Sequence, residues 1–244
     1  RPVGAGAPLP GVNRLVGGRR NLSDRVHRPT SYTARISGSA SYLSSQASYA
    51  RRMSARNRVT PFSDIVAVPL RGLFMGNRGC LHKDGDIVRH HVGKRWIVCE
   101  TDFRGRRVEQ WTEGRYTVLF FHDEAVALAA GHRPCAECRR GRYNEFRAAW
   151  GGTPSADEMD AQLHRERLGD RWNAPWESLP DGAFVVHDGA PALVSGRYVV
   201  PWSTAGYGAP IERPPKGSVT VLTPPSTVTA LAAGYAPVVA FDTE

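Results

Sequence analysis

The pair Cys135 and Cys138 constrains this chain more than any other feature of its sequence. Two intervening residues let both thiolates turn onto one cation, and the pair leads directly into an apolar-periodic helix expected at 139–150. A helix N-terminus favours thiolates. In a chain with only 4 cysteines, Cys-x-x-Cys indicates a metal or a redox site, and the βαβ start typical of thioredoxin-like proteins is absent. We therefore expect bound zinc.

The other candidate ligands lie earlier in the chain. Cys99 ends an expected strand over 95–99 and offers a third thiolate. Cys80 and His82 are two residues apart, so in an extended segment both face the same side. Either one would complete a tetrahedron, and the sequence leaves the choice between them open.

Residues 120–140 read FFHDEAVALAAGHRPCAECRR. This stretch resembles the second half of the Ada-type zinc-binding domain, the metal module of the bacterial methyl-phosphotriester repair protein. There, a strand ending in aromatics and an Ala-rich helix precede Arg-Pro-Cys-x-x-Cys. Extended upstream, the resemblance covers about 96–140, and it implies that Cys99 is the first ligand and the methyl acceptor. The family's second ligand cysteine is replaced here by Phe103, so the fourth ligand must come from elsewhere.

Charge is distributed unevenly along the chain, whose formal net charge is +9. Residues 1–60 carry a balance of +10, residues 71–150 carry +5 and residues 151–244 carry −5. A basic half of this size suits contact with DNA or RNA phosphates. The arginines that we assign to such a surface are Arg104, Arg106, Arg107, Arg139, Arg140 and Arg142.

The sequence predicts an α+β protein in four parts. Residues 1–60, rich in Arg, Ser and Gly, are expected to be a disordered tail. An Ada-like zinc module over 61–150, a helical linker over 151–180 and a small β-rich unit over 181–244 follow. The sequence contains no run of about 18 apolar residues, so it predicts no membrane-spanning helix. No apolar signal segment opens the sequence either, so we expect a cytoplasmic protein without a membrane partner. The excess of Arg over Lys suggests a GC-rich bacterial genome.

Three functions follow from these patterns. The leading hypothesis is a zinc protein that contacts nucleic acid through the basic module. The second is a zinc-dependent hydrolase or transferase, nuclease-like, with its site between the zinc module and the C-terminal unit. The third is a structural or interaction module in which zinc only holds the fold. The sequence assigns no catalytic residue and no organic cofactor.

Overall fold

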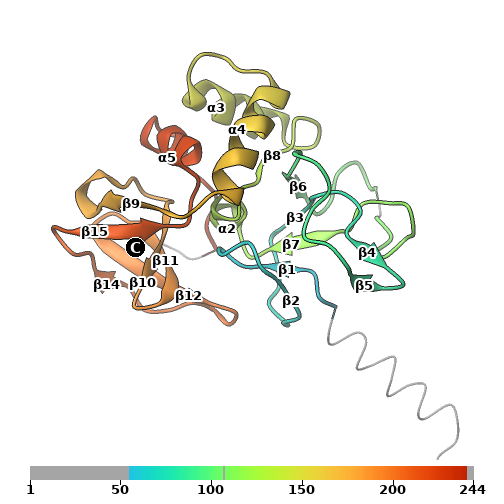
Figure 1. The fold of residues 1–244 in the computed structure, drawn as a ribbon, viewed down its shortest axis with the longest axis horizontal. Helices are drawn as coiled ribbons and strands as arrows, with labels where there is room; N and C mark the ends of the chain where they lie inside the picture. The colour runs from blue at the N-terminus through green and yellow to red at the C-terminus, as the bar shows by residue number, and fades with distance from the viewer. Residues whose placement is uncertain (1–54, 107, 241–244) are drawn as a thin grey trace, which may run out of the picture. The chain divides into compact units, whose positions relative to one another are not determined.

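The computed structural model describes residues 55–106 and 108–240, and its first sheet is built from residues 58–134 (Figure 1). The strand order is β2-β1-β7-β3-β6-β8. Two neighbouring pairs, β1 with β7 and β6 with β8, are parallel, and the others are antiparallel. The strands are β1 (Arg58–Val59), β2 (Ile65–Val66), β3 (Phe74–Asn77), β6 (Ile97–Glu100), β7 (Leu119–Phe121) and β8 (Arg133–Pro134); β4 (His82–Lys83) and β5 (Asp86–Ile87) form a separate ladder.

A second sheet is built from residues 172–221, in the order β13-β12-β11-β10-β15-β9 with β14 paired to β12. Its central hairpin turns at Asp188 and Gly189, whose φ angles are 50° and 76°. Two residues with positive φ are what a tight hairpin requires, and Asp-Gly is a pair that adopts them readily. The strands are β9 (Trp172–Pro175), β10 (Phe184–His187), β11 (Ala190–Ser195), β12 (Tyr198–Ser203), β13 (Gly206–Tyr207), β14 (Ile211–Glu212) and β15 (Ser218–Val221).

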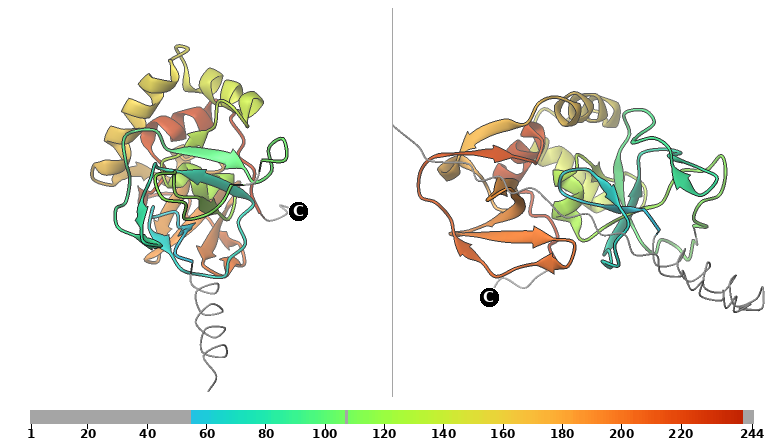
Figure 2. Two further views of the ribbon diagram at one scale, coloured as in Figure 1. Left: turned by 90° about the vertical axis from the view of Figure 1, so that its right-hand side faces the viewer. Right: turned by 60° about the horizontal axis from the view of Figure 1, so that its bottom comes forward.

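Four α-helices lie within the described residues, and the sequence accounts for how they begin. Asp123 caps the first helix by accepting a hydrogen bond of 2.8 Å from the Val126 N–H, and Ser155 forms a capping box with Glu158. Helix α5 packs against α3 and α4, as both views of Figure 2 show. The helices are α2 (Glu124–Ala129), α3 (Arg140–Trp150), α4 (Ala156–Leu168) and α5 (Pro225–Ala232); a single 3-10 turn, η1, covers Trp176–Ser178.

Helix α2 is shared by the cores of both sheets. Every one of its residues is buried, and most are alanine or valine, which let other elements approach closely. Ala127 packs in a cluster with strands of the first sheet, whereas Val126 packs with Phe184 and Leu193 of the second. The regions predicted as a zinc module and a β-rich unit are therefore joined through one buried helix.

The α+β class predicted from the sequence is confirmed, and three details differ from the expected parts. Strand β1 lies in the region assigned to the tail; most of that region, residues 1–54, lies outside the described residues. Strand β9 lies in the expected linker and pairs with β15. Helix α4, also in the expected linker, does more than connect two parts, because its Met159 and Leu163 are buried. No described helix is long and apolar enough to cross a membrane.

Candidate metal centre

Three of the four cysteines converge at one end of the first sheet. The sulfur atoms of Cys99, Cys135 and Cys138 all lie within 4.8 Å of one another. Cys99 and Cys135 are buried and Cys138 is half-buried. Among the described residues this is the one group of three or more Cys, His, Asp or Glu side chains with their ligand atoms so close together. Three sulfurs at this separation can hold one metal ion.

Strand pairing explains how residues 36 positions apart meet. Strand β8 runs parallel to β6 with Val98 opposite Pro134, so the next residues, Cys99 and Cys135, lie level at the strand ends. A hydrogen bond of 2.9 Å from the Cys135 N–H to the Val98 carbonyl fixes this register. Because the partner strands are short and adjacent, the position of Cys99 relative to the pair depends on backbone pairing rather than on flexible side chains.

The turn after Cys135 brings Cys138 back onto the same point. The Cys135 carbonyl accepts a hydrogen bond of 3.2 Å from the Arg139 N–H. The Glu137 N–H points at the Cys135 sulfur, at 3.4 Å. Backbone N–H groups aimed at sulfur stabilise a thiolate and leave its other lone pairs for a cation. The Cys-x-x-Cys segment is therefore preorganised for binding a metal.

The pKa values of the three thiols depend on one another. Contacts with Cys138 and Cys99 lower the pKa of Cys135, and the contacts with Cys135 and Cys138 raise the pKa of Cys99. Proximity thus makes the loss of one proton easy and the loss of all three difficult, because like charges repel. A bound divalent cation removes this obstacle, since it compensates the thiolate charges directly.

A cavity of about 150 Å³ opens beside the sulfurs and includes all three cysteines in its wall. Met75 lies directly opposite Cys99 in the β3–β6 pairing, so both side chains point to the same face of the sheet. The remaining wall residues are Asn77, Ile97, Glu100, Phe103, Arg106, Val108, Tyr116 and Glu137. All of them fall between residues 75 and 138. The cavity therefore lies within the predicted zinc module, not against the C-terminal unit.

Cys80 and His82, the two candidates for a fourth ligand, do not belong to the cysteine group. The His82 ring is buried, with Nδ1 2.7 Å from Thr117 Oγ1 and Nε2 3.1 Å from the Thr112 carbonyl. The Cys80 sulfur contacts the His82 carbonyl at 3.8 Å. Both imidazole nitrogens are thus engaged in tying the loop before β7 to the β4–β5 ladder, which is a structural role.

Two of the six arginines assigned to a nucleic-acid surface are paired with carboxylates of this chain; Arg139 is buried and Arg142 is half-buried. The Arg139 side chain is 2% exposed and forms ion pairs with Glu100 at 2.9 Å and Glu124 at 2.8 Å. Arg142 pairs with Glu124 at 3.1 Å and with Glu145 at 2.5 Å. These contacts count against both assignments, because each guanidinium is already paired with the buried carboxylate of Glu124.

Of the other four arginines, three are exposed and one lies outside the described residues. Arg106 is exposed and pairs with Glu137 at 2.8 Å. Arg104 stacks over the Phe103 ring at 4.9 Å and is exposed, as is Arg140. Arg107 lies outside the described residues. A phosphate-contacting surface at this site would thus rest on Arg104, Arg106 and Arg140 among the described residues.

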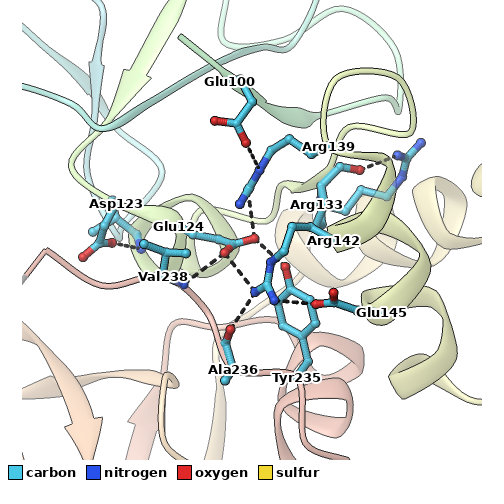
Figure 3. A network of polar contacts seen from close by, with 12 residues as sticks. Glu100, Asp123, Glu124, Arg133, Arg139, Arg142, Glu145, Tyr235, Ala236 and Val238 are labelled. Atoms are coloured by element: carbon cyan, nitrogen blue, oxygen red, sulfur yellow. Dashed lines mark hydrogen bonds and ion pairs between the residues drawn. The ribbon is translucent and has the colours of Figure 1, made fainter. Parts of the chain in front are cut away.

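Sequence reasoning missed the role of the carboxylate that pairs with the arginine at the start of α3, directly after the Cys-x-x-Cys pair. Glu124 is fully buried at the start of α2, and its oxygens accept hydrogen bonds from Arg139, Arg142, the Tyr235 hydroxyl and the Val238 N–H (Figure 3). Burial would raise the pKa of Glu124, but Arg139 and these hydrogen bonds outweigh it and hold the pKa below its ordinary value. The sequence does contain a signal for a buried, paired carboxylate, because Glu124 is the one charged residue in an otherwise apolar six-residue helix.

Comparison of the chain with family models, with curated proteins and with solved structures finds no match.

Proposed function

We propose that the chain binds one zinc ion through Cys99, Cys135 and Cys138, with one coordination position left for an exchangeable ligand in the adjoining cavity. The observation that carries this proposal is the convergence of three sulfurs, with no fourth Cys, His, Asp or Glu ligand atom within 4.8 Å of all three among the described residues. Thiolate ligands select soft metals, and zinc prefers four tetrahedral ligands. Structural zinc sites are closed by four protein ligands, whereas three protein ligands and an open position are typical of zinc sites that act on a substrate.

This arrangement favours a zinc-dependent transferase or hydrolase over a module in which zinc is only structural. The cavity beside the sulfurs gives a ligand access to the open position. The grouping of Cys99 with the Cys-x-x-Cys pair also supports the ligand set that the Ada-type resemblance implies. That resemblance remains part of the proposal, as does methyl acceptance by Cys99.

Metal analysis of the full chain tests the proposal. We expect one zinc per chain, and replacement by Co²⁺ should give sulfur-to-cobalt charge-transfer absorption from three thiolates with the visible bands of a tetrahedral ion. Cys80→Ser and His82→Asn should each leave the metal content at one per chain, because neither residue belongs to the cysteine group. Loss of metal in either variant would restore that residue as the fourth ligand and close the site.

Contact with nucleic acid is a second proposal, supported by the exposed Arg106 in the wall of the cavity and by the exposed Arg104 and Arg140. Residues 1–60 carry a balance of +10 and would attract phosphates unaided, so the informative quantity is a difference in salt dependence. Combined replacement of Arg104, Arg106 and Arg140 by Ala should weaken DNA binding for all sequences. It should also reduce the salt slope by about 1 for each lost phosphate contact.

The matched control for this experiment is Arg89→Ala, which removes an exposed arginine that does not line the cavity. It should leave the slope unchanged. An equal slope in the triple variant and the parent chain would exclude these three arginines from any nucleic-acid interface.

A further inference from the structure

We propose that the exchangeable position takes the sulfur of a small thiol that also carries an anionic group, and that the site holds this thiol as its thiolate. The inference rests on the proposed zinc site and names the class of ligand that the site would take. Four features carry it: the charge of the ligand set, the size of the cavity, the nature of its walls and the position of Arg106.

The charge of the ligand set favours a thiol over water as the activated group. Three thiolates reduce the charge of a Zn²⁺ site from +2 to −1. The zinc sites that lower the pKa of bound water to about 7 have mostly neutral histidine ligands. An electron-rich trithiolate ion acidifies water less, yet a coordinating thiol is deprotonated outright. A fourth sulfur also matches the softness of the three already present.

The size of the cavity limits the ligand to a small molecule. Its volume is about 150 Å³. One water molecule needs roughly 10–15 Å³ on this measure, and a cavity of about 150 Å³ is known to hold benzene. The site therefore admits a molecule of several heavy atoms.

The walls of the cavity suit a short aliphatic chain ending in sulfur. Met75, Ile97 and Val108 supply apolar surface close to the cysteines, with Phe103 beside them. Apolar walls with a few placed polar groups are typical of sites for small ligands. Asn77 and Tyr116 supply neutral polar groups at this cavity. The carboxylates of Glu100 and Glu137 also line it, and they are paired with Arg139 and Arg106.

Arg106 provides the recognition of an anionic group. Its guanidinium lies 5.5 Å from the Phe103 ring centroid, in the wall of the cavity. Its ion pair with Glu137 is open to water, since the two side chains are 58% and 64% exposed. Such exposed pairs contribute little, so the guanidinium can exchange Glu137 for the carboxylate of a ligand, to which it can bond through two N–H groups.

The binding step involves no change in oxidation state. The thiol sulfur forms a bond to the metal and displaces the exchangeable water, while the S–H bond breaks and its proton passes to solvent. Per chain, one thiol is bound, one water is released and one proton appears. The product is a metal-bound thiolate, which is a nucleophile at neutral pH.

The test uses the full chain loaded with Co²⁺ and two probes, 3-mercaptopropionate and 2-mercaptoethanol. We expect each thiol to raise the sulfur-to-cobalt charge-transfer absorption in the ratio of four sulfur ligands to three, with one proton released per chain. Arg106→Ala should weaken the binding of 3-mercaptopropionate about tenfold, because it removes a charge-assisted hydrogen bond. Binding of 2-mercaptoethanol should not change. 3-Hydroxypropionate, which has no sulfur, should leave the spectrum unaltered.

A cavity-filling variant separates binding in the cavity from attack on the metal from outside. Val108→Trp should keep the three-sulfur cobalt spectrum and abolish the response to either thiol, whereas Val88→Trp, at an exposed site that does not line the cavity, should behave as the parent chain. A cobalt spectrum that does not respond to thiols, or thiols that only extract the metal, would overturn the inference and leave the proposed metal site standing. An equal loss of affinity for both thiols in Arg106→Ala would overturn the anionic part. Absence of cobalt binding would refute the metal site itself.

Discussion

A chain carrying both Cys135→Ser and Cys138→Ser should contain no zinc and should lose on the order of 10 kcal/mol of folding free energy, the scale measured for structural zinc in small modules. The physical reason is the position of the three sulfurs. Cys99 lies in β6, Cys135 follows β8 and Cys138 precedes α3, so the ion ties two strands and a helix together. Because whole domains are stable by only about 5–15 kcal/mol, such a loss would leave little folded protein. Zinc content and the thermal unfolding midpoint measure both effects.

The matched control is Cys80→Ser, the same chemical change at the cysteine outside the group. It should keep one zinc per chain and shift the unfolding midpoint only slightly. Cys99→Ser on its own should lower zinc affinity strongly, because it removes the ligand that anchors the ion to the sheet. Retention of zinc by the double variant would refute the proposed centre.

The part of this site that the sequence predicts is the part set by local chemistry. The spacing of Cys135 and Cys138 and the helix that follows them are short-range features, and both are present. Cys99 was found because it ends an apolar strand, and the structure places it in the group through the pairing of β6 with β8. That pairing is parallel and non-local, so no spacing rule contains it.

The assignment of Cys80 or His82 rested on a local rule that does not decide a long-range contact. Residues two apart share a face in a strand, but which partner that face meets depends on the rest of the chain. Here the hydroxyl of Thr117, 35 residues away, contacts Nδ1 of the His82 ring. The Thr117 hydroxyl also accepts a hydrogen bond of 2.8 Å from the Leu81 N–H. This bond holds the segment against the loop before β7.

Arg139 and Arg142 show why charge counts do not locate a surface. In the sequence they belong to a basic run, and nothing in that run distinguishes an exposed guanidinium from one bound to a buried acid. Glu124 makes the difference, because its buried carboxylate requires cations beside it. The acid lies 15 residues before Arg139 and on another helix, so the pair is visible only once α2 and α3 are packed together.

Glu124→Gln should destabilise the protein by about 3–5 kcal/mol, the usual result of removing one partner of a buried ion pair. The substitution keeps the shape of the side chain but leaves Arg139, 2% exposed, with only the half-exposed Glu100 to balance its charge. It also turns one acceptor of the network in Figure 3 into a donor facing other donors. Chemical denaturation at neutral pH measures the change in the free energy of unfolding.

The pH dependence of stability gives this prediction a second readout. The pKa of Glu124 is lower in the folded protein than its ordinary value of 4.5, so ionised Glu124 stabilises the fold above that pH. This contribution is lost as the pH falls through the folded pKa, because the carboxylate must then take up a proton. The Gln variant lacks the titrating group, so the difference between parent and variant should be full at neutral pH and shrink on acidification below about pH 4.5.

Glu145→Gln is the control, since Glu145 pairs with the same Arg142 but its side chain is 58% exposed. We expect it to change the free energy of unfolding by less than about 1 kcal/mol, the range of surface ion pairs. A difference between the two variants of severalfold would therefore reflect burial rather than charge alone. Equal and small effects at both positions would show that Glu124 does not hold α3, and with it the Cys-x-x-Cys turn, against the rest of the fold.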